Sequence, residues 1–359
     1  MAHFHLAAAG ADAGLVTRLS ARLHAAIRSC LALAALVAAL PPVADAADKV
    51  VVYSGRAERL IKPVLDSFQT KTGIEVELLS SGTTELVNRL QAEGERTAAD
   101  LFLTNDIGGL ERARELGLLA SVELDGIERS VPAQFRAPDN RWIGLSERFW
   151  IIVYNTTLVK PAEVRSILDL ADPRWKDKIA IPNAGSEYLQ AGVSVLMAVH
   201  GEERTAKFLE GLKANAGTYV FGKSSQIVEA VAKGQVAMGV VNHYYVFRHL
   251  ATVPTAPIAM LLPDQQEGGM GAIVNAAGVG ILKHSRHPDA AKRLVEFLAS
   301  PDGQKLFADL NKEYPLHPQV AADPALPRRQ SFRACAVPLV RLGELREPSA
   351  KLIERVGLR

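Results

Sequence analysis

Apolar residues follow two alternating patterns along most of the chain. Short continuous apolar runs, such as the valines of residues 49–53, are typical of buried parallel strands. They alternate with longer segments such as residues 58–72, where leucine, isoleucine, valine and phenylalanine recur at helical spacing. This alternation predicts an α/β fold, in which a doubly wound, mostly parallel sheet carries helices on both faces.

The same reading locates the individual elements along the chain. It predicts strands over residues 49–53, 74–79, 100–103, 151–155, 236–241 and 273–282, with another inside 175–182. It predicts helices over residues 58–72, 84–93, 107–116, 187–199, 203–214, 226–233, 287–299 and 303–310. The tail beyond Asn311 is rich in proline, and we expect it to be helical from Leu339 onward.

Two segments between these elements are expected to cross between two lobes. Residues 132–140 are polar and contain proline, and residues 268–272 are glycine-rich without the lysine of a phosphate loop. Two crossings predict a hinged clamshell whose ligand binds in the cleft between the lobes. The expected boundaries are residues 47–138 with 273–312 for lobe 1, and 139–272 with 313–359 for lobe 2.

The first 46 residues have the pattern of a secretion signal. Three arginines precede an apolar run of about ten residues, which is followed by the cleavage site Ala44-Asp-Ala46. The run is shorter than the roughly 20 residues that a membrane-spanning helix needs. We therefore expect residues 1–46 to be a signal peptide and the mature protein to be periplasmic. Cys335 would then be its one cysteine, so we expect no internal disulfide.

Charge and motifs narrow the function classes. The formal net charge is +2 and no Lys/Arg run tracks a phosphate backbone, so we expect no nucleic-acid partner. The sequence has no His-Glu-x-x-His helix, no cysteine pair and no Gly-x-Ser-x-Gly elbow. We therefore expect a binding protein and not an enzyme.

The candidate chemistry centres on two adjacent tyrosines. Tyr244 and Tyr245 follow an apolar run that ends in Asn242, a residue favoured at helix N-caps. In the first turn of a helix, neighbouring side chains lie about 100° apart, so the two phenols can converge on one ligand. Packing of the pair in the core is the alternative.

Three further loops are expected at the carboxyl ends of the lobe 1 strands, where ligands bind in such sheets. They are residues 54–58, 80–84 and 104–106. The loop 80–84, with the sequence Ser-Ser-Gly-Thr-Thr, leads into a helix. Its amide groups are expected either to hold an anion or simply to cap that helix.

Several motifs together resemble the periplasmic ferric-ion-binding proteins of ABC transporters, the bacterial transferrin-like group. The resemblance covers almost all of the expected mature chain, and its specific part is Asn242-His-Tyr-Tyr245. It implies a two-lobed, type II periplasmic binding protein. The other matching stretches are Val51-Val-Tyr-Ser-Gly-Arg56, Ala99-Asp-Leu-Phe102, Arg148-Phe-Trp-Ile-Ile-Val-Tyr-Asn155, Asp172-Pro-Arg-Trp-Lys176, Ala277-Gly-Val-Gly-Ile-Leu282, Ser300-Pro-Asp-Gly-Gln304 and Glu313-Tyr-Pro315.

The resemblance also implies the ligand set. Tyr244 and Tyr245 match the family's paired phenolates, and Tyr154 matches the third tyrosine that many members add. Where many relatives have a first-lobe histidine, this chain has Ala57, so Glu58 is the candidate to replace it. Fe(III) is a hard cation, and anionic oxygen ligands suit it. Tyr53, Tyr188 and Tyr219 are expected to be packing residues, and Tyr314 a loop anchor.

The remaining expectations concern an anion and the partners. Arg56 and Arg148 are expected to hold a synergistic anion such as carbonate, and Ser224 and Asn242 match anion contacts in some relatives. An alternative keeps the fold but binds a phosphonate or phosphate ester through Arg56 and Arg148. The expected partner is the permease of an ABC importer, served by a monomeric binding protein.

Overall fold

The computed structural model describes residues 49–358, so the predicted signal peptide lies outside the described part of the chain. In the described part, no helix is long and apolar enough to cross a membrane. Strands and helices alternate as the apolar pattern predicts. The helix α2, for example, buries Leu60, Ile61, Val64, Leu65 and Phe68 on one face.

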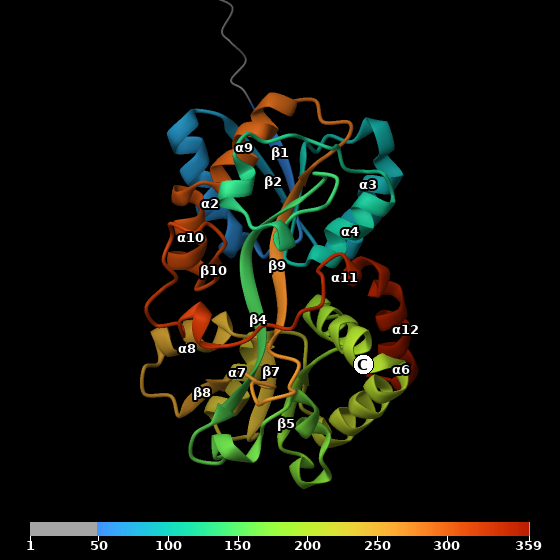
Figure 1. The fold of residues 1–359 in the computed structure, drawn as a ribbon, viewed down its shortest axis with the longest axis vertical. Helices are drawn as coiled ribbons and strands as arrows, with labels where there is room; N and C mark the ends of the chain where they lie inside the picture. The colour runs from blue at the N-terminus through green and yellow to red at the C-terminus, as the bar shows by residue number, and fades with distance from the viewer. Residues whose placement is uncertain (1–48, 359) are drawn as a thin grey trace, which may run out of the picture. The chain divides into compact units, whose positions relative to one another are not determined.

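Two groups of elements flank a pair of long central strands (Figure 1). The central strands are β4 (Ile143–Asn155) and β9 (Ile273–Ile281). One group contains β1 (Lys49–Ser54), β2 (Glu75–Ser80), β3 (Leu101–Thr104), α2 (Glu58–Thr72), α3 (Thr83–Glu93), α4 (Ile107–Glu115), α5 (Ile127–Ser130), α9 (Pro288–Ala299) and α10 (Pro301–Asn311). The other contains β5 (Ile179–Pro182), β6 (Val220–Phe221), β7 (Met238–Asn242), β8 (Ile258–Leu261), α6 (Glu187–Ala216), α7 (Ser224–Ala232) and α8 (Tyr244–Thr252).

The strands form one mixed sheet in the order β2-β1-β3-β9-β4-β7-β5-β6. The outer strands pair in parallel, β1 with β2 and β3, and β5 with β6 and β7. The central strands are antiparallel to their neighbours, because β9 pairs with β3 and β4, and β4 pairs with β7. The parallel units expected from the sequence are therefore joined through antiparallel strands.

The strand β4 is longer than the predicted strand over residues 151–155, and its register fixes the site. Trp150 lies opposite Asn242 of β7, and Tyr154 lies opposite Met238. Since β4 and β7 run antiparallel, Tyr154 lies at the end of this strand pair that is remote from Asn242. Asn242 is the last residue of β7, and α8 begins at Tyr244 after His243, not directly after Asn242.

The C-terminal segment packs against both groups. After β10 (Tyr314–Pro315), which pairs with β4, the chain forms α11 (Arg341–Glu344) and α12 (Arg346–Val356). The helix α11 contacts α4, and α12 contacts α6. The two predicted helices over residues 187–199 and 203–214 form α6, which is interrupted at Gly201, where φ is 78° and the backbone is not helical.

Candidate functional site

A cavity of about 790 Å³ lies where residues from both groups meet. Its lining includes Ala57 and Asn105 from loops that follow β1 and β3. Tyr188, Ser224 and Tyr245 line it from the first turns of α6, α7 and α8. These three helices follow β5, β6 and β7, so the cavity lies at the carboxyl ends of parallel strands, where such sheets bind ligands.

The predicted tyrosine pair is at this cavity. Tyr244 is buried, with 1% of its surface exposed, whereas Tyr245 is half-buried and lines the cavity. Their ring centroids lie 4.6 Å apart. The Asn242 side-chain amide lies 3.4 Å from the Tyr244 hydroxyl, to which it donates. The end of β7 and the start of α8 therefore bring the two phenols to one place.

The third tyrosine at the site is Tyr188, which the sequence had led us to expect as a packing residue. The Tyr244 hydroxyl donates to the Tyr188 oxygen at 3.3 Å, and the Asn105 amide donates to the same oxygen at 3.2 Å. The Tyr188 and Tyr245 rings are 6.4 Å apart, centroid to centroid. Three phenols from two helix starts therefore converge; Tyr188 and Tyr245 line the cavity, and Tyr244 lies behind them in contact with both.

Tyr154 does not join them. It lies four residues beyond Trp150, the residue opposite Asn242, and four residues along a strand span about 13 Å. Tyr154 is also absent from the cavity lining. The physical reason is strand direction. The strand β4 is antiparallel to β7, so its carboxyl end lies at the opposite edge of the sheet, whereas β5, which precedes Tyr188, is parallel to β7.

Strand direction also explains why the sequence analysis did not identify Tyr188 as a site residue. It stands just after the helix N-cap Ser186 and a buried strand, the same context as Tyr244. The sequence could therefore have marked Tyr188 as a candidate, but it does not show which strands run parallel.

Burial keeps the phenols of Tyr188 and Tyr244 protonated when no metal is bound. The pKa of Tyr188 is raised because its hydroxyl is buried and lies near the Tyr245 phenol, although Arg148 opposes the shift. The pKa of Tyr244 is raised by burial and then by Tyr188 and Tyr245. A cation that binds here as a phenolate complex must therefore displace protons.

Two buried arginines lie beside the phenols with few partners. Arg56 donates through Nη2 to the Glu313 carboxylate at 2.6 Å, but its Nε and Nη1 have no partner in the described structure. Burial would lower the pKa of Arg56, yet the Glu313 carboxylate raises it above its ordinary value. All three guanidinium nitrogens of Arg148 are buried without a partner, and its Cζ lies 5.5 Å from the centroid of the Tyr188 ring. Buried polar groups usually have partners, so these five nitrogens are available to donate to an anion.

The other predicted residues are placed differently. Ser224 lines the cavity and Asn242 contacts Tyr244, so both lie at the site. Glu58 is exposed in the first turn of α2 and does not line the cavity, so its position gives no support to a role as metal ligand. Its neighbour Ala57 does line the cavity but offers no donor atom.

His243, beside the tyrosine pair, is fully buried. The Phe149 amide donates to its Nδ1 at 3.1 Å, so Nε2 carries the proton and donates to the Lys312 carbonyl at 2.8 Å. Burial lowers the pKa of His243 to about 4, and the imidazole is neutral at pH 7. His243 thus ties the start of α8 to β4 and to the end of α10.

The donor set limits what the site can bind. Within residues 49–358, no three or more His, Cys, Asp or Glu side chains cluster as a metal site. Besides the phenols, the cavity lining includes the carboxylate of Glu187, which is already bonded to Thr83, so the phenol oxygens, hard donors once ionised, are the main candidate ligands for a metal. The arrangement fits a hard, highly charged cation.

Comparisons with known proteins point in the same direction. The family model for bacterial extracellular solute-binding proteins matches residues 64–332. Iron uptake protein A1 of Synechocystis sp. is 31% identical, over 88% of this chain and 90% of its own. The major ferric iron-binding protein of Neisseria meningitidis serogroup B is 30% identical, over 94% of this chain and all of its own.

Solved structures share the fold. A Trichodesmium protein in complex with iron and citrate ligands is 32% identical and has a TM-score of 0.77, covering 87% of this chain and 100% of its own. The predicted fold class, an α/β two-lobed periplasmic binding protein, is confirmed by such neighbours. These relatives are binding and transport proteins, as expected for a chain that is not an enzyme.

Proposed function

Because this chain belongs to the family of bacterial extracellular solute-binding proteins, we propose that it captures Fe(III) for an ABC iron importer. The observation that carries the proposal is the meeting of three phenols, Tyr188, Tyr244 and Tyr245, at one cavity. The relatives named for iron uptake and ferric iron binding support it.

The chemistry follows from charge. Three phenolates cancel the charge of Fe(III), and a nearby metal ion reverses the usual pKa logic and holds a phenol ionised at neutral pH. Tyr244 is buried and Tyr188 is half-buried, so water has limited access to a metal at their oxygens. The hydrogen bond from Asn105 to Tyr188 persists with a phenolate, which is the stronger acceptor. Asn105 therefore fixes this ligand from the loop after β3.

The unpartnered arginines support an accompanying anion. Once three phenolates balance Fe(III), Arg56 and Arg148 exceed the Glu313 carboxylate by one positive charge. Carbonate, or a carboxylate of a chelator such as the citrate seen in the Trichodesmium complex, would supply negative charge and acceptor atoms. We assign Ser224, which lines the cavity, and Asn242, which contacts Tyr244, to orient this anion.

The alternative of a phosphonate or phosphate ester uses the same arginines but leaves the phenols without a role. Raised phenol pKa values would also offer an anion only neutral hydroxyls. The three converging phenols therefore favour iron over a small anion as the principal ligand.

The remaining parts of the proposal concern organisation and setting. We assign residues 47–138 with 273–312 to lobe 1, and 139–272 with 313–359 to lobe 2. The long strands β4 and β9, which run between the two strand groups, support the two-lobed division. We further propose a signal peptide over residues 1–46, a periplasmic location, action as a monomer and transfer of iron to an ABC permease.

Colour provides a direct test. Protein loaded from ferric citrate is expected to be orange-red from phenolate-to-iron charge transfer. Changing Tyr244 and Tyr245 together to Phe removes the colour while the fold is retained, as circular dichroism can verify. Wild-type protein that stays colourless and takes no Fe(III) contradicts the proposal.

Two single variants test the ligand assignment, and bicarbonate tests the anion. Tyr188→Phe is expected to weaken and shift the band, whereas Tyr154→Phe leaves it unchanged. The opposite pattern would restore Tyr154 as the ligand. Titration with and without bicarbonate, repeated with Arg148→Gln, tests the anion, because only the wild type is expected to respond.

A further inference from the structure

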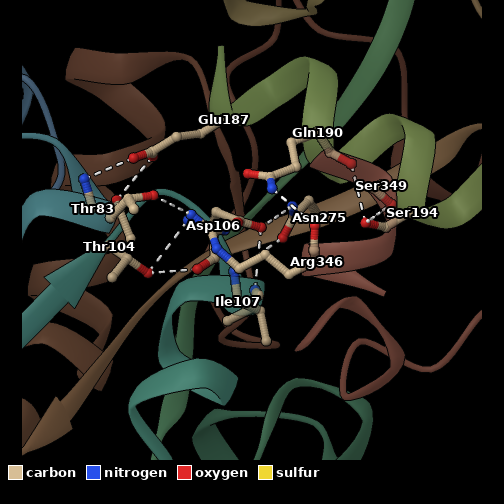
Figure 2. Close-up of polar contacts among 12 residues, drawn as sticks. Thr83, Thr104, Asp106, Ile107, Glu187, Gln190, Ser194, Asn275, Arg346 and Ser349 are labelled. Carbon is tan, nitrogen blue, oxygen red and sulfur yellow. Dashed lines mark hydrogen bonds and ion pairs between the residues drawn. The ribbon is translucent and has the colours of Figure 1, made fainter. Parts of the chain in front are cut away.

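The amino end of α3 is capped by a side chain from α6 and not by its own. Glu187 accepts from the Thr83 amide at 2.7 Å and from the Thr83 hydroxyl at 2.8 Å (Figure 2). The N-cap residue of α3 is Gly82, which has no side chain to serve the free amides. A carboxylate at this position is favoured by the helix dipole as well as by the two hydrogen bonds.

This contact shows what the amides of the loop 80–84 bind, which the sequence left open between an anion and simple helix capping. The loop holds an anion at its helix start, and that anion is the carboxylate of Glu187. The receiving residue is held in place, because Thr83 is fully buried between two glycines. A Cβ on Gly55 would lie 2.1 Å from the Thr83 hydroxyl oxygen, and one on Gly109 would lie 2.3 Å from its methyl carbon.

Glu187 is also the residue next to Tyr188, one of the three phenols. Both are in the first turn of α6, and both contact the group of elements that contains β1, β2 and β3. Glu187 does so through Thr83, and Tyr188 does so through the amide of Asn105. The position of Tyr188 therefore depends on how the start of α6 is attached to α3.

We propose that Glu187 is a positioning residue that latches the start of α6 onto α3 and so holds Tyr188 against the other two phenols. The inference rests on the proposed iron function, since it assigns Glu187 the task of slowing iron release. Glu187 also lines the cavity, but its carboxylate is bonded to the Thr83 amide and hydroxyl, so the proposal assigns it to holding Tyr188 and not to binding the metal.

A second set of hydrogen bonds lies beside the Glu187–Thr83 contact and is expected to hold α3 and α6 together when that contact is lost. Arg346, at the start of α12, donates to the Asp106 carboxylate at 2.7 Å (Figure 2). It also donates to the Thr84 hydroxyl at 2.8 Å. Its carbonyl accepts from the Gln190 amide of α6 at 2.9 Å. Since Arg346 joins α3, α4 and α6 independently, loss of the Glu187 carboxylate is expected to loosen Tyr188 without unfolding the protein.

The test is the rate at which iron-loaded protein loses its colour to an excess of a strong chelator. Glu187→Ala is expected to release iron about tenfold faster, the lower end of what loss of a supporting contact costs a metal site. The release rate of Glu187→Gln is expected to lie between those of the wild type and Glu187→Ala, because its one carbonyl can still accept from the Thr83 amide. The matched control Glu203→Ala, an exposed position on the same helix, is expected to match the wild type.

A double-mutant cycle separates a latch from a general loss of stability. If Glu187 acts through Thr83, then Thr83→Ala accelerates release in the wild type but adds little to Glu187→Ala. Additive effects on the logarithm of the rate overturn the latch, and so does a Glu187→Ala rate equal to that of the wild type. Wild-type protein that never colours refutes the iron proposal instead, so the two failures are distinguishable.

Discussion

The number of protons released on iron binding tests the three-phenol site most sharply. A tyrosine phenol ordinarily titrates near pH 10, and burial raises the pKa of Tyr188 and Tyr244 further. At pH 6 to 7 Tyr188 and Tyr244 are therefore protonated, and each phenol that becomes a ligand must release its proton. We expect three protons per iron from Tyr188, Tyr244 and Tyr245.

The energetic consequence is large. Each displaced proton changes the binding free energy by about 1.4 kcal/mol per pH unit. Three protons therefore make the affinity rise by about 4 kcal/mol for each unit of increasing pH, and fall by the same amount as the pH decreases. A site with two phenolates would show only about two thirds of this slope.

The count is measured in a pH-stat without bicarbonate, as ferric nitrilotriacetate is added to iron-free protein. Protons taken up by the freed chelator are measured separately and added back. We expect three protons for the wild type, two for Tyr188→Phe and three for Tyr154→Phe. A count of three for Tyr188→Phe with two for Tyr154→Phe refutes the placement of the third ligand.

The remaining predictions concern the iron-free protein. Glu313→Gln leaves the buried Arg56 without its carboxylate and is expected to lower the free energy of unfolding by about 3 kcal/mol in urea titrations. Asp309→Asn, which breaks an exposed pair, is expected to cost under about 1 kcal/mol, and similar costs for both contradict the reasoning. The pKa of His243 falls from 6.5 to about 4 on folding, because the protein buries the neutral imidazole. The free energy of unfolding therefore contains a contribution of about 3 kcal/mol from His243 that is complete above pH 6.5 and is lost as the pH falls to 4. The difference in unfolding free energy between the wild type and His243→Gln should shrink as the pH falls from 6.5 to 4. A difference that stays constant with pH refutes this assignment to His243. His284→Gln serves as the control.

Much of the fold could be predicted because it is encoded locally. The helices α2 and α9 have apolar residues at helical spacing, and their observed bounds differ from the predicted ones by one residue or less. Strand β1 is an unbroken valine run, and it is buried as predicted. Such patterns depend on neighbours within a few residues, so they survive without knowledge of the tertiary structure.

The tyrosine pair could be predicted for the same reason. Tyr244 and Tyr245 are adjacent, so their convergence depends only on where a strand ends and a helix begins. The family resemblance then attached a ligand to them. The sequence analysis also assigned anion binding to Arg56, Arg148 and Asn242, and all three are buried. Asn242 contacts Tyr244, and Arg148 lies over the Tyr188 ring.

The third phenol depended on the tertiary structure. Tyr154 lies near the end of the buried strand β4 and Tyr188 follows the buried strand β5. The chain alone does not show that β4 runs antiparallel to β7 while β5 runs parallel to it. A strand's direction decides the edge of the sheet at which its last residue lies. The same holds for Glu187, whose partner Thr83 is 104 residues away in the chain.

The sequence by itself thus determined which segments are helices and strands, and which adjacent residues offer phenol oxygens. The tertiary structure decided which distant residues join them, because strand order and direction arise from the packing of the whole sheet. It brought Tyr188 to the pair, left Tyr154 at the far edge and placed the Glu187 carboxylate on α3.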